Sequence, residues 1–296
     1  MFQEFLNQIL KISKSGNFQE QTYKVSEIVN SYTDDDIKKI VKDIGTIPEC
    51  IKASSSEEKL FSKTSDIILS KCFNILGLKS NAIKERADSA DVIAVSNFHK
   101  YSLVADAKCF RMSRTAKNQK DFKVGALSNW RGTENEYAVL VSPFFQYPKE
   151  ESQIYKTALD ENVCLFSWEH LSILLEHNIK ETENFSLESI WNSSKMFARE
   201  TKIPNAKSCF LPKIHEIVAK KIGISREDFL KLLNFYRLEI ISRGGHEIDY
   251  CQSKIEEINM LTREEAIKQL IKETKLEERI KVITHYILTL KEKIDE

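Results

Sequence analysis

Two short apolar runs carry acidic residues where a metal site would need them. Asp91 directly precedes the run at 92–95, and Asp106-Ala107-Lys108 closes the next run, which begins at Leu103. Side chains alternate along a strand, so Asp106 and Lys108 are expected on one face and Ala107 on the other. Carboxylate oxygens are ligands that Mg²⁺ prefers, and a bound metal activates water for attack on a phosphodiester. The pattern indicates phosphodiester hydrolysis.

Each of these residues has a role in that chemistry. Asp91 and Asp106 are predicted to bind Mg²⁺, together with the main-chain carbonyl of Ala107. Lys108 is predicted to orient or help deprotonate the attacking water. Glu85, just upstream, is a candidate ligand for a second metal ion, and Mn²⁺ is expected to substitute for Mg²⁺.

An acidic residue two positions before a lysine is weak support when it stands alone. The same spacing occurs at Asp36/Lys38, Glu57/Lys59, Asp121/Lys123 and Glu273/Lys275. An exposed strand end with a salt bridge would give the same triplet. Asp106 and Lys108 differ because an apolar run precedes them, and a second such run before it opens with Asp91.

Basic residues gather in the same part of the chain. The whole chain is neutral, with 44 Lys and Arg against 44 Asp and Glu, so no global charge attracts it to DNA. Between Lys100 and Arg131, however, eight basic residues stand beside two acidic ones. The basic residues are Lys100, Lys108, Arg111, Arg114, Lys117, Lys120, Lys123 and Arg131, and the acidic ones are Asp106 and Asp121. This local excess suits a phosphate backbone.

Within this basic region, the segment 114–123 is predicted to contact DNA bases. The residues concerned are Arg114, Ala116, Lys117, Asn118, Lys120, Asp121 and Lys123. An asparagine suits adenine, a lysine suits guanine, an aspartate accepts from cytosine, and an alanine methyl suits thymine. A solvated helix start with ordinary charges is the alternative interpretation of the same residues.

Other chemistries have less support. The six cysteines are widely spaced without a CxxC pair, and the six histidines form no metal-ligand pair. The glycine-rich nucleotide-binding motifs GxGxxG and GxxxxGK[ST] are absent. No signal-peptide pattern opens the chain, and no apolar run is long enough to span a bilayer. We therefore expect a cytoplasmic protein with reduced thiols and no membrane partner.

Apolar spacing predicts the elements that position the candidate residues. Residues 92–95 and 103–105 indicate a β-hairpin, and 137–141 and 162–166 indicate two further strands. Helix-like patterns cover 152–159 and 168–176, and capping-box patterns at Thr33/Asp36, Ser54/Glu57 and Thr262/Glu265 indicate helices on either side.

The predicted fold class is α/β, with a small mixed central sheet flanked by many helices and with helical N- and C-terminal regions. A single nuclease domain is expected over 1–296. It would comprise an N-terminal helical part at 1–80, a catalytic and DNA-reading core at 81–180 and a helical C-terminal part at 181–296.

Several longer stretches resemble one enzyme family. They are EEKLFSK at 57–63, LVADAK at 103–108, SRTAKNQKDFK at 113–123, FFQYP at 144–148 and FSWEH at 166–170. These stretches resemble the HindIII family of type II restriction endonucleases, within the PD-(D/E)xK nuclease superfamily. The similarity is strongest from about residue 47 to about residue 176, and TREEAI at 262–267 extends it.

The resemblance implies a PD-(D/E)xK restriction-endonuclease core and Mg²⁺-dependent double-strand cleavage by a homodimer at a palindrome. It further implies the site AAGCTT, cut after the first A to leave 5′ overhangs, and functional pairing with a cognate DNA methyltransferase. The family's D-x-K falls on Asp106 and Lys108, its acid at the start of the first hairpin strand on Asp91, and its upstream acid on Glu85. Ala90 stands where the family name has proline.

Two alternatives remain open from the residues. A nuclease with the same fold could select DNA structure or damage instead of a sequence. A DNA-binding protein could also keep the fold without cutting, because an isolated D-x-K triplet is common.

Overall fold

The structure is a computed structural model that describes residues 1–83, 90–114, 119–149, 152–200 and 203–292. The described chain forms two units, Met1–Gly244 and Gly245–Glu296, each of which is described by itself below. The predicted site residues Glu85, Ala116, Lys117 and Asn118 lie outside the described residues. The single domain expected over 1–296 stays a prediction.

The first unit is built on a five-stranded sheet in the order β1-β2-β3-β4-β5. Its strands are β1 (Leu78–Ala82), β2 (Val92–Ser96), β3 (Ser102–Ala107), β4 (Tyr137–Ser142) and β5 (Val163–Ser167). The pairs β1/β2 and β2/β3 are antiparallel, whereas β3/β4 and β4/β5 are parallel. The predicted α/β class with a small mixed sheet is confirmed, and so are the four predicted strands.

Burial along the strands follows from their composition. β4 and β5 are buried at every position, as expected for apolar parallel strands that helices cover on both faces. β1 has the sequence LKSNA and alternates buried with exposed residues. That short polar strand was not predicted, because its residues have low strand propensity and only Leu78 is apolar before Ala82.

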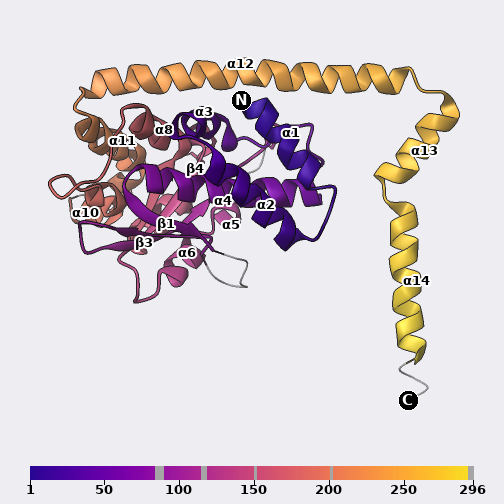
Figure 1. Ribbon diagram of the computed structural model, residues 1–296, viewed down its shortest axis with the longest axis horizontal. Helices are drawn as coiled ribbons and strands as arrows, with labels where there is room; N and C mark the ends of the chain where they lie inside the picture. The colour runs from indigo at the N-terminus through magenta and orange to yellow at the C-terminus, as the bar shows by residue number, and fades with distance from the viewer. Residues whose placement is uncertain (84–89, 115–118, 150–151, 201–202, 293–296) are drawn as a thin grey trace. The chain divides into compact units, whose positions relative to one another are not determined.

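The N-terminal helices are α1 (Phe2–Ile12), α2 (Phe18–Ser31), α3 (Asp34–Ile44) and α4 (Ser56–Ile75). The capping box of Thr33 and Asp36 at the start of α3 is confirmed. The cap predicted at Ser54 and Glu57 is displaced by one residue, since Ser55 accepts from the Glu58 N–H at 3.2 Å. The helix α4 packs along β1, β2 and β3 in the first unit, which Figure 1 shows as ribbons. Most of the α4 side chains are buried.

Further helices of the first unit cover the parallel half of the sheet. They are α5 (Gln119–Phe122), α6 (Val124–Arg131), α7 (Gln153–Asp160), α8 (Trp168–Glu176), α9 (Glu188–Trp191), α10 (Ser193–Glu200) and α11 (Ile203–Ile222), with the 3₁₀ turn η1 (Phe144–Gln146). α6 contacts β3, β4 and β5, and α7 and α10 contact β5. One apolar core joins these helices to the sheet and to the N-terminal helices.

The long helix α12 (Arg226–Asn259) begins in the first unit, where Phe229, Leu233 and Tyr236 are buried. Its last residues belong to the second unit, together with α13 (Arg263–Glu273) and α14 (Leu276–Glu292). The predicted capping box of Thr262 and Glu265 is confirmed at the start of α13. No helix in the described part of the chain is long and apolar enough to cross a membrane.

Candidate active site

The β2/β3 hairpin brings Asp91 and Asp106 together. Asp106 lies near the end of β3, and Asp91 directly precedes β2. The antiparallel register pairs Val92 with Ala105, so the next step toward the same end of the sheet places Asp91 opposite Asp106. The parallel strand β4, which is buried throughout, supports β3 on the other side. Two acidic residues that are separated in the sequence therefore lie side by side at one end of adjacent strands.

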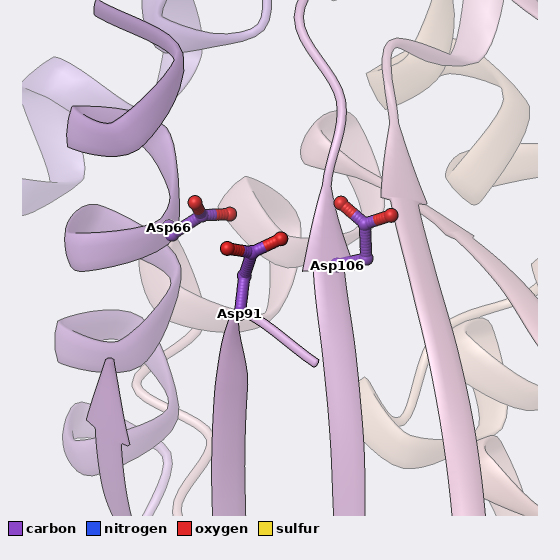
Figure 2. A group of neighbouring side chains, drawn as sticks. All are labelled: Asp66, Asp91 and Asp106. Carbon is purple, nitrogen blue, oxygen red and sulfur yellow. The ribbon is translucent and has the colours of Figure 1, made fainter. Parts of the chain in front are cut away.

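A third carboxylate reaches the same point from helix α4. One carboxylate oxygen from each of Asp66, Asp91 and Asp106 lies within 4.8 Å of the others. Figure 2 shows the three side chains converging from α4, from the start of β2 and from the end of β3. Asp66 was missed by the sequence reasoning. The available signal was its position three residues before Leu69 on the apolar side of a capped helix, where an unpaired acid is costly.

Two lysines border the three carboxylates. The Lys108 ammonium lies 2.5 Å from Oδ2 of Asp106, so these two side chains do meet on one face. The Lys63 ammonium lies 3.0 Å from Oδ1 of Asp91 and 3.7 Å from Oδ2 of Asp66. Lys63 is 7% exposed, and a lysine so buried requires anionic partners of this kind.

Ala107 connects the end of β3 to helix α4. Its N–H donates to Oδ1 of Asp66 at 3.3 Å, which fixes the Asp66 carboxylate against the strand. The next N–H, that of Lys108, donates to the Val141 carbonyl at 2.7 Å and continues the pairing with β4. The D-x-K backbone is therefore held on both sides.

Burial raises the pKa of two of the three carboxyl groups. The pKa of Asp106 is raised above 3.8 because the side chain is desolvated, and the Lys108 charge opposes that rise. The pKa of Asp66 is raised well above 3.8, first by desolvation and then by repulsion from Asp91. Lys63 opposes the second shift. An additional positive charge between buried carboxylates stabilises their ionised forms, which burial otherwise disfavours.

Described residues on either side of positions 115–118 hold the ends of the predicted base-reading segment. Arg114 and Asp121 form an ion pair at 2.5 Å across residues 115–118. Phe122 follows at once, and it packs on Phe110 at 5.4 Å and on Tyr147 at 5.7 Å between ring centroids. This aromatic anchor ties the segment to the core that carries the carboxylates.

The other basic residues of this region differ in what they contact. Lys120 and Lys123 are exposed, and the Lys123 charge is one of those that lower the pKa of Asp106. Arg111 pairs with Glu58 at 2.9 Å, and Arg131 donates to the carbonyls of residues 161 and 162. The last two arginines therefore stabilise the fold, and the local charge excess overstates what DNA can reach.

Comparison with known proteins agrees with this geometry. The HindIII restriction endonuclease family matches residues 3–286. The type II restriction enzyme HindIII of Haemophilus influenzae is 43% identical over 274 residues, which cover 93% of this chain and 91% of that enzyme. A match over nearly the whole of both chains includes the sheet, the three-carboxylate edge and the C-terminal helices. The chain therefore belongs to the HindIII restriction endonuclease family and is a type II site-specific deoxyribonuclease.

Proposed function

We propose that this enzyme makes Mg²⁺-dependent double-strand cuts at the palindrome AAGCTT, after the first A, and leaves 5′ overhangs. The observation that carries the proposal is the convergence of three carboxylates within 4.8 Å beside Lys108. The recognition sequence comes from the family resemblance. Mn²⁺ is expected to replace Mg²⁺.

The residues at the sheet edge fit a hard divalent cation. Their donor atoms are carboxylate oxygens, and two of the three acids are almost fully buried with raised pKa values. Such a donor set suits Mg²⁺ or Mn²⁺ and does not suit a thiolate-preferring metal. When bound, the metal supplies charge stabilisation for the phosphate oxygens and lowers the pKa of a coordinated water.

Asp91 and Asp106 would hold the metal, as the sequence predicts, and Asp66 would join them as a third ligand. The carbonyl of Ala107 remains the predicted fourth donor. Lys108 is held at Oδ2 of Asp106, where its ammonium can hold the attacking water and contribute a positive charge beside the phosphate. Glu85 stays a predicted ligand for a second ion.

DNA would be read by the segment that the Arg114–Asp121 pair and Phe122 anchor. Asn118, Lys117 and Ala116 remain the predicted base contacts, while exposed Lys120 and Lys123 suit phosphates or guanine. Arg114 and Asp121 form an ion pair through one guanidinium nitrogen, and the remaining guanidinium donors and carboxylate lone pairs can still contact a base. The proposed enzyme acts as a homodimer and is functionally paired with a cognate DNA methyltransferase.

Digestion of a sequenced plasmid tests this function. The purified chain is incubated with Mg²⁺, Mn²⁺ or EDTA, and the cut ends are sequenced. Discrete fragments whose ends fall at AAGCTT, in both metals and never in EDTA, are expected. Cutting at another fixed sequence would overturn the assigned site. A smear would favour a structure-selective nuclease, and intact plasmid under both metals would favour a silent DNA-binding protein.

A further inference from the structure

Lys63 is a buried lysine beside the candidate site to which the proposed cleavage assigns no role. It lies on α4, one turn before Asp66, and is 7% exposed. Its ammonium lies 3.0 Å from Oδ1 of Asp91 and 3.7 Å from Oδ2 of Asp66. Lys108 contacts the remaining carboxylate, that of Asp106. One cation from α4 therefore serves two of the three carboxylates.

Stability alone does not explain a lysine at this position. Burial of an ion pair costs desolvation that the attraction between the charges seldom repays in full, so such pairs are weak sources of stability. Leu60, Phe61 and Ile67, which are the buried apolar neighbours of Lys63 on α4, show what kind of side chain packs there without that cost. The role of Lys63 therefore lies in the carboxylates that it contacts.

Lys63 contacts the same oxygen atoms that a metal ion would need. The three carboxylates, which Figure 2 shows, lie close enough to repel one another when ionised. Oδ1 of Asp66 already accepts from the Ala107 N–H, and Oδ2 faces the Lys63 ammonium. The two neighbouring ammonium groups leave the carboxylates with only a small negative excess. A divalent cation exceeds that excess, so the cation and Lys63 repel each other.

We propose that Lys63 is the built-in counter-cation of the site, which holds Asp91 and Asp66 in place before a metal binds and then competes with the metal for their oxygens. The inference rests on the proposed metal site and adds a residue that sets its affinity. Lys63 acts through the two carboxylates and is therefore a positioning residue. Loss of its charge weakens the fold without metal and tightens metal binding. A merely structural lysine would weaken both.

The test compares Lys63→Gln with a matched control, Lys59→Gln, in the full chain. Glutamine keeps a hydrogen-bond donor without the charge. Lys59 is an exposed lysine of the same helix, and its ammonium lies 3.9 Å from the centroid of the Phe18 ring. Calorimetric titration with Ca²⁺ measures metal affinity without cleavage. Lys63→Gln is expected to bind Ca²⁺ at least about tenfold more tightly than the native chain, and Lys59→Gln is expected to match the native chain.

Thermal melting of the same proteins measures the other half of the proposal. Without Ca²⁺, Lys63→Gln is expected to melt at a lower temperature than Lys59→Gln, because Asp91 and Asp66 lose their shared partner. Ca²⁺ is expected to raise the melting temperature of Lys63→Gln by more than that of the native chain. Lys63→Arg, which keeps the charge, is expected to restore nearly native Ca²⁺ affinity.

The outcomes separate this inference from the proposed metal site. If the native chain binds Ca²⁺ and Lys63→Gln binds it equally or more weakly, the inference fails and the metal site stands. If neither the native chain nor any variant binds Ca²⁺, both fail. Ca²⁺ binding that is measurable only in Lys63→Gln supports the inference. Should Lys63→Gln fold only with Ca²⁺, the inference is supported, and a variant that stays unfolded at saturating Ca²⁺ overturns it.

Discussion

Asp106 and Lys108 meet at 2.5 Å at the end of a strand that buried neighbours fix in place. Replacement of either side chain by alanine removes charge from the reacting centre and leaves the base-reading segment intact. We expect Asp106→Ala and Lys108→Ala to abolish cleavage while specific DNA binding persists. Gel-shift assays and plasmid cleavage, run on the same preparations, measure the two properties separately. Full cutting by either purified variant would refute the assignment.

Asp66 allows a sharper test, because only the structure places it in the site. We expect Asp66→Asn to keep the hydrogen bond from the Ala107 N–H, to weaken binding of Ca²⁺, and to slow cleavage at least about 100-fold. Calorimetric titration with Ca²⁺ gives a measure of metal affinity without turnover. The matched control Ser70→Ala removes another buried polar group of α4, which contacts Ser80 and none of the carboxylates. Equal Ca²⁺ affinity in the two variants would remove Asp66 from the site.

The raised pKa values predict how pH and metal act together on stability. The Asp66 and Asp106 carboxyls have pKa values above the ordinary 3.8, so the fold favours their protonated forms. Their stabilising contribution is complete below about pH 3.8 and is lost as the pH rises through the folded-state values. A divalent cation binds the ionised forms, so its stabilisation must grow with pH.

We therefore expect Ca²⁺ to raise the melting temperature more at pH 8 than at pH 5. Differential scanning calorimetry with and without Ca²⁺ at the two pH values measures the difference. The variant Asp106→Asn carries no titrating group at that position and is expected to lose most of it. An equal effect of Ca²⁺ at both pH values would contradict the assignment of these carboxylates as ligands.

At the scale of residues, the sequence predicted Asp91, Asp106 and Lys108 because strand alternation and hairpin register are local rules. Asp66 depends instead on how α4 packs across the sheet, some 25 residues before β2. Lys63 was missed for the same reason, although it pairs with both Asp66 and Asp91. A charged pair on the apolar side of a capped helix is the feature that could have identified both.

At the level of elements, the segment 114–123 is predicted to contact DNA bases, and substitutions in it test this role. If it reads bases, Asn118→Ala should cost about 1–3 kcal/mol of discrimination at one base pair. Lys120→Ala, which removes an exposed charge, should weaken binding to all sequences alike. Competition binding against single-substitution duplexes, repeated at two salt concentrations, distinguishes the two effects. Normal site preference in Asn118→Ala would remove Asn118 from the reading segment.

Strands and helices were predicted to different degrees for physical reasons. β4 and β5 are apolar apart from the serine that ends each strand, so their composition alone identifies them. β1 is recognisable only through its partner β2, because lysine, serine and asparagine fill its centre. The start of α4 was misplaced by one residue since Ser54, Ser55 and Ser56 are equivalent caps in sequence. The structure selects Ser55 by its bond from the Glu58 N–H.

At the level of the whole molecule, the sequence predicted a helical C-terminal part at 181–296 without indicating what its apolar faces pack against. The structure divides these helices between a first unit that buries its apolar residues and a second unit that buries none of those described. Amphipathic spacing predicts that a face will be covered, but it does not say by what.

We propose that Asp66, Asp91 and Asp106 hold the divalent ion on which DNA cleavage depends. Anomalous diffraction from a crystal of the enzyme with DNA and Mn²⁺ tests it most directly. We expect a manganese peak within about 2–2.6 Å of an oxygen from each of the three carboxylates, next to the scissile phosphate. A peak bound elsewhere, or an enzyme that cuts with no metal between these carboxylates, would contradict it.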